Sequence, residues 1–143
     1  KDLGAIMMTY GNVYVAQVAM GADPNQLVKA LKEAEAYDGP SVIIAYTPCT
    51  AHGIKAGMQN VQAEMKRAVD SGYWLLYRYD PRKEHPMQLD SKAPTLDYTA
   101  FLEGETRYAS LRLSFPENAE TLFAAGSEDA ARRYEKYRKM GEL

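Results

Sequence analysis

Three short apolar runs, separated by two stretches with helical spacing, constrain the possible folds of this chain more than any other feature. The runs are rich in β-branched and aromatic residues and almost continuously hydrophobic, which is typical of strands covered on both faces. They comprise residues 13–19, 41–46 and 74–79, and the helical stretches between them lie at about 24–37 and 54–69. This order predicts right-handed crossovers and an α/β fold, with a parallel sheet and helices on both faces.

Local signals mark where these elements begin and end. Asp23 can cap a helix that starts with Pro24, and Gln26 stands where a capping box requires it. The apolar stripe predicted for that helix consists of Leu27, Val28, Leu31, Ala34 and Tyr37. A shorter helix is expected at residues 2–10, because Gly11 is of a residue type that commonly ends helices.

The character of the chain changes at Pro81. Residues 81–97 are polar and rich in proline, which predicts an extended surface crossing with little regular structure. Two helical stretches follow, at about 97–113 and 118–140. Pro116 separates them, and Gly126 predicts an interruption of the second. The predicted units are residues 1–80, an α/β unit, and residues 81–143, a crossing and helical C-terminal extension packed on the same domain.

The composition argues against several classes of protein. A net charge of -2 provides no basic surface that would neutralise nucleic-acid phosphates. No apolar run approaches the roughly 20 residues that a membrane-spanning helix requires. A single cysteine cannot form an internal disulfide, which is consistent with a reducing cytoplasm. Because the chain starts at Lys1 without an initiator methionine, we expect it to be a piece of a longer protein.

Cys49 is the residue that most directly suggests chemistry. It follows the second predicted strand by three residues, and ligands of open parallel sheets bind beyond the carboxyl ends of strands. A lone cysteine is also often a small buried hydrophobic residue. Cys49 and His52 could form a nucleophile and its base, while His85, the other histidine, is expected at the surface. One cysteine cannot hold an iron–sulfur cluster, so as a metal ligand Cys49 needs partners from outside this chain.

Two further features have an ordinary structural interpretation beside a functional one. Gly53 and Gly57 lie between a strand and a helix, where backbone N–H groups could bind an anion or where a tight turn is required. Pairs of acidic residues fall on predicted helix faces and are interpreted as solvated surface. These pairs are Glu33 with Glu35, Glu103 with Glu105, and Glu128 with Asp129.

Several longer strings together resemble the C-terminal region of the pyruvate:ferredoxin (flavodoxin) oxidoreductase family. They are GAI at 4–6, TYGNVYVAQVAMGA at 9–22, PNQ at 24–26, KALKEAEAY at 29–37, PC at 48–49, HGIK at 52–55, GM at 57–58, GYW at 72–74, YRY at 77–79, QLDSK at 88–92 and RYASL at 107–111. The resemblance extends over essentially the whole chain. It is carried by the set of strings rather than by any single one.

The resemblance implies a part in an enzyme of anaerobic metabolism, cytoplasmic and homodimeric. Such enzymes decarboxylate pyruvate on thiamine diphosphate and Mg²⁺, transfer the acetyl group to coenzyme A, and pass electrons through iron–sulfur clusters to ferredoxin or flavodoxin. Residues 1–80 would then be the C-terminal half of the thiamine-diphosphate-binding α/β domain. Cys49 would supply the fourth thiolate of a 4Fe–4S cluster whose other three cysteines precede Lys1.

The same resemblance assigns no catalytic residue and no thiamine contact to this chain. The thiamine and magnesium motif would lie upstream of Lys1, so the fragment by itself is expected to be inactive. The alternative is a non-catalytic α/β module with a structural or dimerisation role, in which Cys49 is a core residue.

Overall fold

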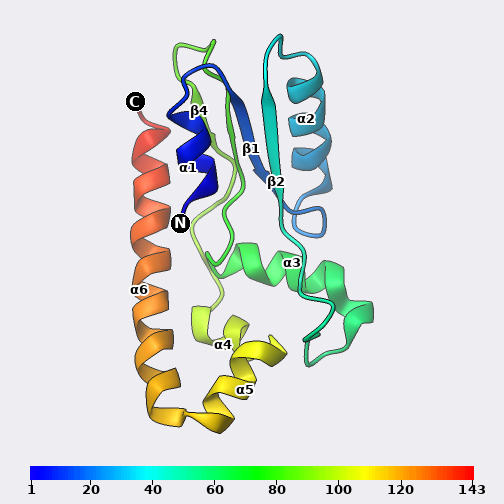
Figure 1. The fold of residues 1–143 in the computed structure, drawn as a ribbon, viewed down its shortest axis with the longest axis vertical. Helices are drawn as coiled ribbons and strands as arrows, with labels where there is room; N and C mark the ends of the chain where they lie inside the picture. Colours follow the sequence, from blue (N-terminus) through cyan, green and yellow to red (C-terminus); the bar gives the residue numbers. More distant parts are fainter.

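A four-stranded mixed sheet forms one end of the molecule, and helices cover both of its faces (Figure 1). The computed structural model describes all 143 residues. The sheet has the order β2-β1-β3-β4, with strands β1 (Tyr14–Val18), β2 (Ser41–Ala45), β3 (Tyr77–Tyr79) and β4 (Met87–Leu89). The predicted α/β class, with helices on both faces, is therefore confirmed.

The direction of the third strand was predicted wrongly. β1 and β2 are parallel as expected, but β3 is antiparallel to β1, with Ala16 opposite Arg78, and β4 is antiparallel to β3. The reason lies in α3 (Val61–Asp70), which crosses the end of the sheet instead of running back along a face (Figure 1). Met65 of α3 packs against Ala19 and Tyr46, which follow the ends of β1 and β2. The chain consequently re-enters the sheet from the end at which it left.

Alternate residues of β1 point to two different helical layers. Tyr14, Ala16 and Val18 form a core cluster with Ala30 of α2 (Pro24–Glu35). On the other face Val15 and Tyr77 pack with residues of α1 (Leu3–Met8) and α6 (Pro116–Met140). A strand buried on both sides explains the nearly continuous apolar run that predicted it.

The predicted start of α2 is confirmed, since Asp23 Oδ1 accepts a hydrogen bond from the Gln26 backbone N–H at 2.9 Å. Its predicted apolar stripe is only partly correct. Val28 and Leu31 are 50% and 49% exposed, whereas Ala30 is fully buried against β1. The face of α2 that packs on the sheet therefore includes the small residue Ala30, and not all of the large apolar residues that the spacing predicted.

The C-terminal extension is mostly helical, as predicted, with differences in detail. Its elements are α4 (Tyr98–Leu102), α5 (Thr106–Ser114) and the 25-residue α6. The predicted interruption at Gly126 does not occur: a Cβ atom there would lie 3.2 Å from the Tyr98 ring, so the glycine permits close packing. The crossing before these helices contains the short strand β4, which was not predicted.

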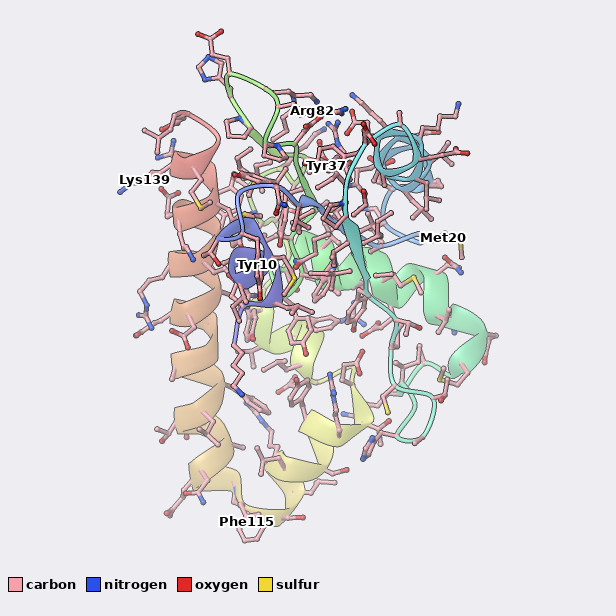
Figure 2. All side chains as sticks on the ribbon, turned by 45° about the horizontal axis from the view of Figure 1, so that its top comes forward. Tyr10, Met20, Tyr37, Arg82, Phe115 and Lys139 are labelled. Atoms are coloured by element: carbon pink, nitrogen blue, oxygen red, sulfur yellow. The ribbon has the colours of Figure 1, made fainter.

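Phe115 marks the corner between α5 and α6. Its side chain is 59% exposed and points away from the body of the protein (Figure 2). Pro116 occupies the first turn of α6, where its missing N–H costs nothing. None of the helices is both long enough and apolar enough to cross a membrane.

Candidate functional site

The loop that carries Cys49 begins directly beyond β2 and leads to a 3₁₀ turn (Met58–Asn60) before α3. The Tyr46 N–H donates to the Val18 carbonyl at 3.0 Å, which continues the β1–β2 pairing by one residue. Pro48 is fully buried, whereas Cys49 is only partly buried. The loop is thus anchored at its base and presents the cysteine near the surface, as expected for the carboxyl end of a strand.

Cys49 and His52 are in direct contact. The Cys49 Sγ lies 3.1 Å from His52 Nδ1, and the Gly53 N–H donates to the Cys49 carbonyl at 2.9 Å. The hydrogen bond from His52, with backbone N–H groups of the same turn, lowers the pKa of Cys49 to about 7. The thiol therefore converts readily to the thiolate, the form that ligates metals and attacks electrophiles.

The far side of the loop is fastened to the turn between α4 and α5. The Lys55 N–H donates to the Gly104 carbonyl at 2.9 Å, and the Thr106 N–H donates to the Gly53 carbonyl at 3.3 Å. Between these two bonds Ile54, which is 6% exposed, forms an isolated β-bridge with Glu105. No sequence signal indicated this contact, because its two sides are about fifty residues apart along the chain.

Glu105 was wrongly interpreted as a surface residue. It is 1% exposed, and Glu64 of α3 is 3% exposed. Burial raises the pKa of both carboxyl groups, although Arg67 and Arg107 act in the opposite direction. The sequence does not reveal which acidic residues face inward. The burial of Glu64 and Glu105 therefore became evident only from the packing of α3 against the turn between α4 and α5.

The other residues singled out from the sequence do not join Cys49. His85 is exposed on the β3–β4 connection, as predicted, and its Nδ1 lies 3.0 Å from the Leu143 carbonyl. Gly53 and Gly57 have φ values of 73° and 88°, which side chains rarely adopt, so both are required by the turn itself. No third side chain orients His52 through a hydrogen bond, as the base of a nucleophile would require.

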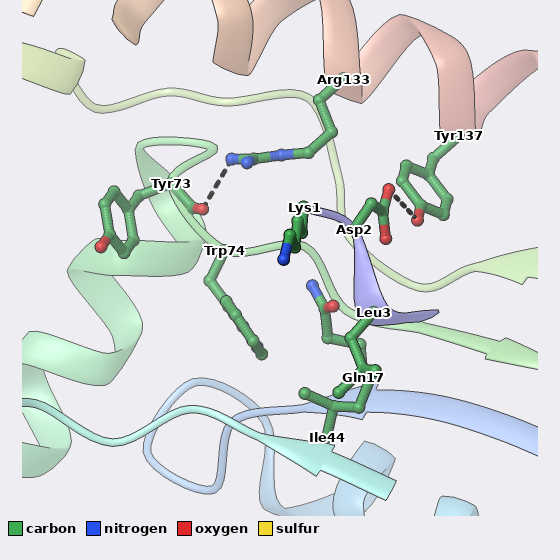
Figure 3. Close-up of a pocket in the computed structure, with 9 residues that line it drawn as sticks. All are labelled: Lys1, Asp2, Leu3, Gln17, Ile44, Tyr73, Trp74, Arg133 and Tyr137. Atoms are coloured by element: carbon green, nitrogen blue, oxygen red, sulfur yellow. Dashed lines mark hydrogen bonds between the residues drawn. The ribbon is translucent and has the colours of Figure 1, made fainter. Parts of the chain in front are cut away.

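A cavity of about 170 Å³ lies elsewhere, between α1, α6 and the sheet (Figure 3). Two of its charged groups, Arg133 and Asp2, already bind other residues that line it. Arg133 donates to the Tyr73 carbonyl at 2.7 Å, and the Tyr137 hydroxyl donates to Asp2 at 2.7 Å. Because no group in the lining points to a particular ligand, the cavity is not assigned a function.

Cys49 is a candidate for one ligand of a metal centre, and the chain holds no complete set. No three His, Cys, Asp or Glu side chains are grouped so that they could hold a metal ion. Cys49 nevertheless has the chemistry of an iron–sulfur ligand, because its thiol is accessible and easily ionised. The donor set is therefore compatible with a cluster shared with other parts of a larger protein.

Comparison with known proteins gives relatives that are much longer than this chain. No model of a protein family matches the chain. It is 56% identical over 146 residues to the pyruvate:ferredoxin oxidoreductase of Moorella thermoacetica, and 53% identical over 144 residues to the pyruvate-flavodoxin oxidoreductase of Klebsiella pneumoniae. These alignments cover 99% and 98% of the chain. The chain spans only 12% of the length of either relative.

Proposed function

We propose, from the premise that this chain belongs to the family of pyruvate:ferredoxin and pyruvate-flavodoxin oxidoreductases, that it is one segment of a much longer redox enzyme. The resemblance noted from the sequence is confirmed by identities of 53% to 56% across almost the whole chain. The observation that carries the proposed role is Cys49, the single thiol, held accessible and easily ionised beyond the end of β2.

The proposed reaction of the whole enzyme is the oxidative decarboxylation of pyruvate with coenzyme A, giving acetyl-CoA and CO₂. Electrons pass through iron–sulfur clusters to ferredoxin or flavodoxin, in a cytoplasmic homodimer. Residues 1–80 belong to the C-terminal half of the domain that binds thiamine diphosphate and Mg²⁺, and residues 81–143 pack on it as an extension. This chain contributes no catalytic residue and no thiamine contact.

Within this enzyme Cys49 donates one thiolate to a 4Fe–4S cluster, whose chemistry is to accept and pass on single electrons. While the cluster is absent, the hydrogen bond from His52 favours the ionised form of the sulfur by lowering the pKa of Cys49 to about 7. The Gly53 N–H, bonded to the Cys49 carbonyl, fixes the turn that aims the sulfur. The backbone hydrogen bonds and β-bridge between residues 53–55 and 104–106 fix the position of the loop, and with it the distance from Cys49 to the other cysteines of the cluster.

The Cys49→Ser substitution in the full-length protein tests this role. We expect the EPR signal of one cluster to disappear or change, and the iron content to fall accordingly, while the remaining clusters stay intact. His52→Gln is the matched control: it changes the same turn without removing the sulfur, and the cluster should remain. Iron content and EPR spectra that Cys49→Ser leaves unchanged would contradict the ligand role.

The alternative, a non-catalytic α/β module, makes the opposite prediction for sequence upstream of Lys1. If the longer reading frame lacks a thiamine-type Gly-Asp-Gly segment and a Cys-x-x-Cys pair, the redox role is lost. The partial exposure of Cys49 argues against its being merely a core residue, because a core thiol is normally buried.

A further inference from the structure

Two buried carboxyl groups lie behind the loop that carries Cys49. Glu64 is contributed by α3, and Glu105 by the turn between α4 and α5. A Cβ atom placed on Gly104 would stand 3.1 Å from Glu64 Oε1, so the Glu64 side chain reaches the residue next to Glu105. Two buried carboxylates near each other repel when both are ionised.

The pair has fewer hydrogen-bond donors than two ionised carboxylates need. Glu64 Oε2 accepts from Arg67 Nη1 at 3.2 Å, and Glu105 Oε1 accepts from the Tyr46 hydroxyl at 3.3 Å. Glu64 Oε1 is buried and has no partner. Since an ionised carboxylate can accept about four hydrogen bonds, a proton on one of the two groups would provide the missing donor.

The charged and titratable groups that face the pair come from each element packed around it. They are Tyr46 after β2, Arg67 on α3 and Arg107 on α5. Burial raises the pKa of Glu64 and of Glu105 despite the two guanidinium groups. The pair therefore binds a proton at higher pH than exposed glutamates do.

This pair is joined to the Cys49 loop through Glu105 itself. Glu105 bridges Ile54, and the residues on either side of it bond to Gly53 and Lys55. The Gly53 N–H in turn holds the Cys49 carbonyl. A change of charge at the sulfur and a change of protonation at Glu105 thus occur on two sides of one set of backbone hydrogen bonds, and the burial of Glu105 strengthens the electrostatic interaction between them.

We propose that Glu64 and Glu105 form a proton-binding site that takes up a proton when an electron is placed beside Cys49 and releases it when the electron leaves. This inference rests on the proposed role of Cys49 as a cluster ligand. One electron comes from the 2-oxoacid as it is oxidised. One proton comes from a solvent hydronium ion, whose O–H bond breaks and leaves water as the O–H bond of the carboxyl group forms. Both transfers reverse when the acceptor protein takes the electron.

The test is the pH dependence of a midpoint potential in the full-length enzyme. The cluster whose EPR signal Cys49→Ser removes is titrated between about pH 6 and about pH 9, a range that spans the raised pKa values documented for buried glutamates. In the unsubstituted enzyme the potential should fall as the pH rises, by at most about 59 mV per tenfold change in proton concentration for one proton per electron. Glu64→Gln should flatten this slope at unchanged iron content, and Glu120→Gln, on the exposed face of α6, should retain it.

A second variant and a second measurement guard against a folding defect. Glu105→Gln should flatten the slope in the same way, and either variant should lose the protonated-carboxyl band that appears in the reduced-minus-oxidised infrared difference spectrum. A potential independent of pH in the unsubstituted enzyme overturns the inference, and so does an equal slope in all three glutamine variants. These outcomes differ from failure of the ligand role, in which Cys49→Ser leaves every cluster signal in place.

Discussion

Replacing Arg78 should destabilise this chain more than replacing any exposed arginine. Arg78 lies on β3 under α2 with 7% of its side chain exposed. Its Nε and Nη2 donate to the two carboxylate oxygens of Asp90 at 2.9 and 2.8 Å, and Nη1 donates to Glu33 Oε1 at 2.7 Å. Arg78→Met keeps most of the packing volume but leaves Asp90 without its cation and Glu33 with only the more distant Lys83, at 3.9 Å.

The expected cost follows from this geometry. Removing one partner of a buried ion pair costs about 3 to 5 kcal/mol. The side chains of Glu33 and Asp90 are 23% and 17% exposed, so water compensates part of the loss and about 3 kcal/mol is expected. With a urea m-value of about 2 kcal/mol/M, the unfolding midpoint should fall by about 1.5 M.

Urea unfolding of the 143-residue chain, followed by the fluorescence of its single tryptophan, measures this change. Trp74 is a suitable probe because its indole N–H donates to the Val18 carbonyl at 3.0 Å and is exposed to water on unfolding. Arg132→Met is the matched control: Arg132 is 66% exposed, so water screens its ion pairs and the substitution should leave the unfolding midpoint almost unchanged.

The pH dependence of the stability difference between the parent chain and Arg78→Met tests whether the ion pair is its cause. Burial opposes ionisation of Glu33, but hydrogen bonds from Arg78 and Tyr14 outweigh it and lower the pKa of Glu33. Stability from a lowered carboxyl pKa is present above the unfolded-state pKa and is lost as the pH falls through the folded-state pKa. The difference between the parent chain and Arg78→Met should therefore shrink in acid. Equal costs for Arg78→Met and Arg132→Met, or a difference that grows in acid, would refute the reasoning.

Two further predictions concern the first helix and the reactive loop. Gly4→Ala would place a Cβ atom 1.7 Å from the Tyr77 hydroxyl oxygen, so the urea midpoint should fall by an amount equivalent to about 1 to 3 kcal/mol, and adding Tyr77→Phe should recover most of it. An unchanged midpoint in Gly4→Ala would show that α1 does not sit this tightly on the sheet. In the cofactor-free chain, alkylation of Cys49 by iodoacetamide should reach half its maximal rate near pH 7, and His52→Gln should move this midpoint toward 9.0. Identical rate profiles in both chains would contradict the hydrogen bond as the cause.

Much of the candidate site could be predicted from local sequence. The position of Cys49 beyond a strand depends on a short apolar run and the residues that end it, and both are read within a dozen positions. The cap at Asp23 is confirmed for the same reason, since a capping hydrogen bond joins residues three apart. The family resemblance then indicated a role for the single cysteine, as a ligand of an iron–sulfur cluster whose other cysteines lie outside this chain.

Tertiary structure alone decided the direction of β3 and the environment of Glu105. An apolar run predicts a strand but not its direction, which here depends on α3 crossing the sheet end rather than a face. The burial of Glu105 depends on contacts with Ile54 and Tyr46, tens of residues away, and helical periodicity does not encode such contacts. The sequence by itself therefore determined where β1, β2, β3 and the main helices form and where the thiol emerges, but not the short strand β4. Packing between distant segments determined how the strands pair and which carboxyl groups lie behind that thiol.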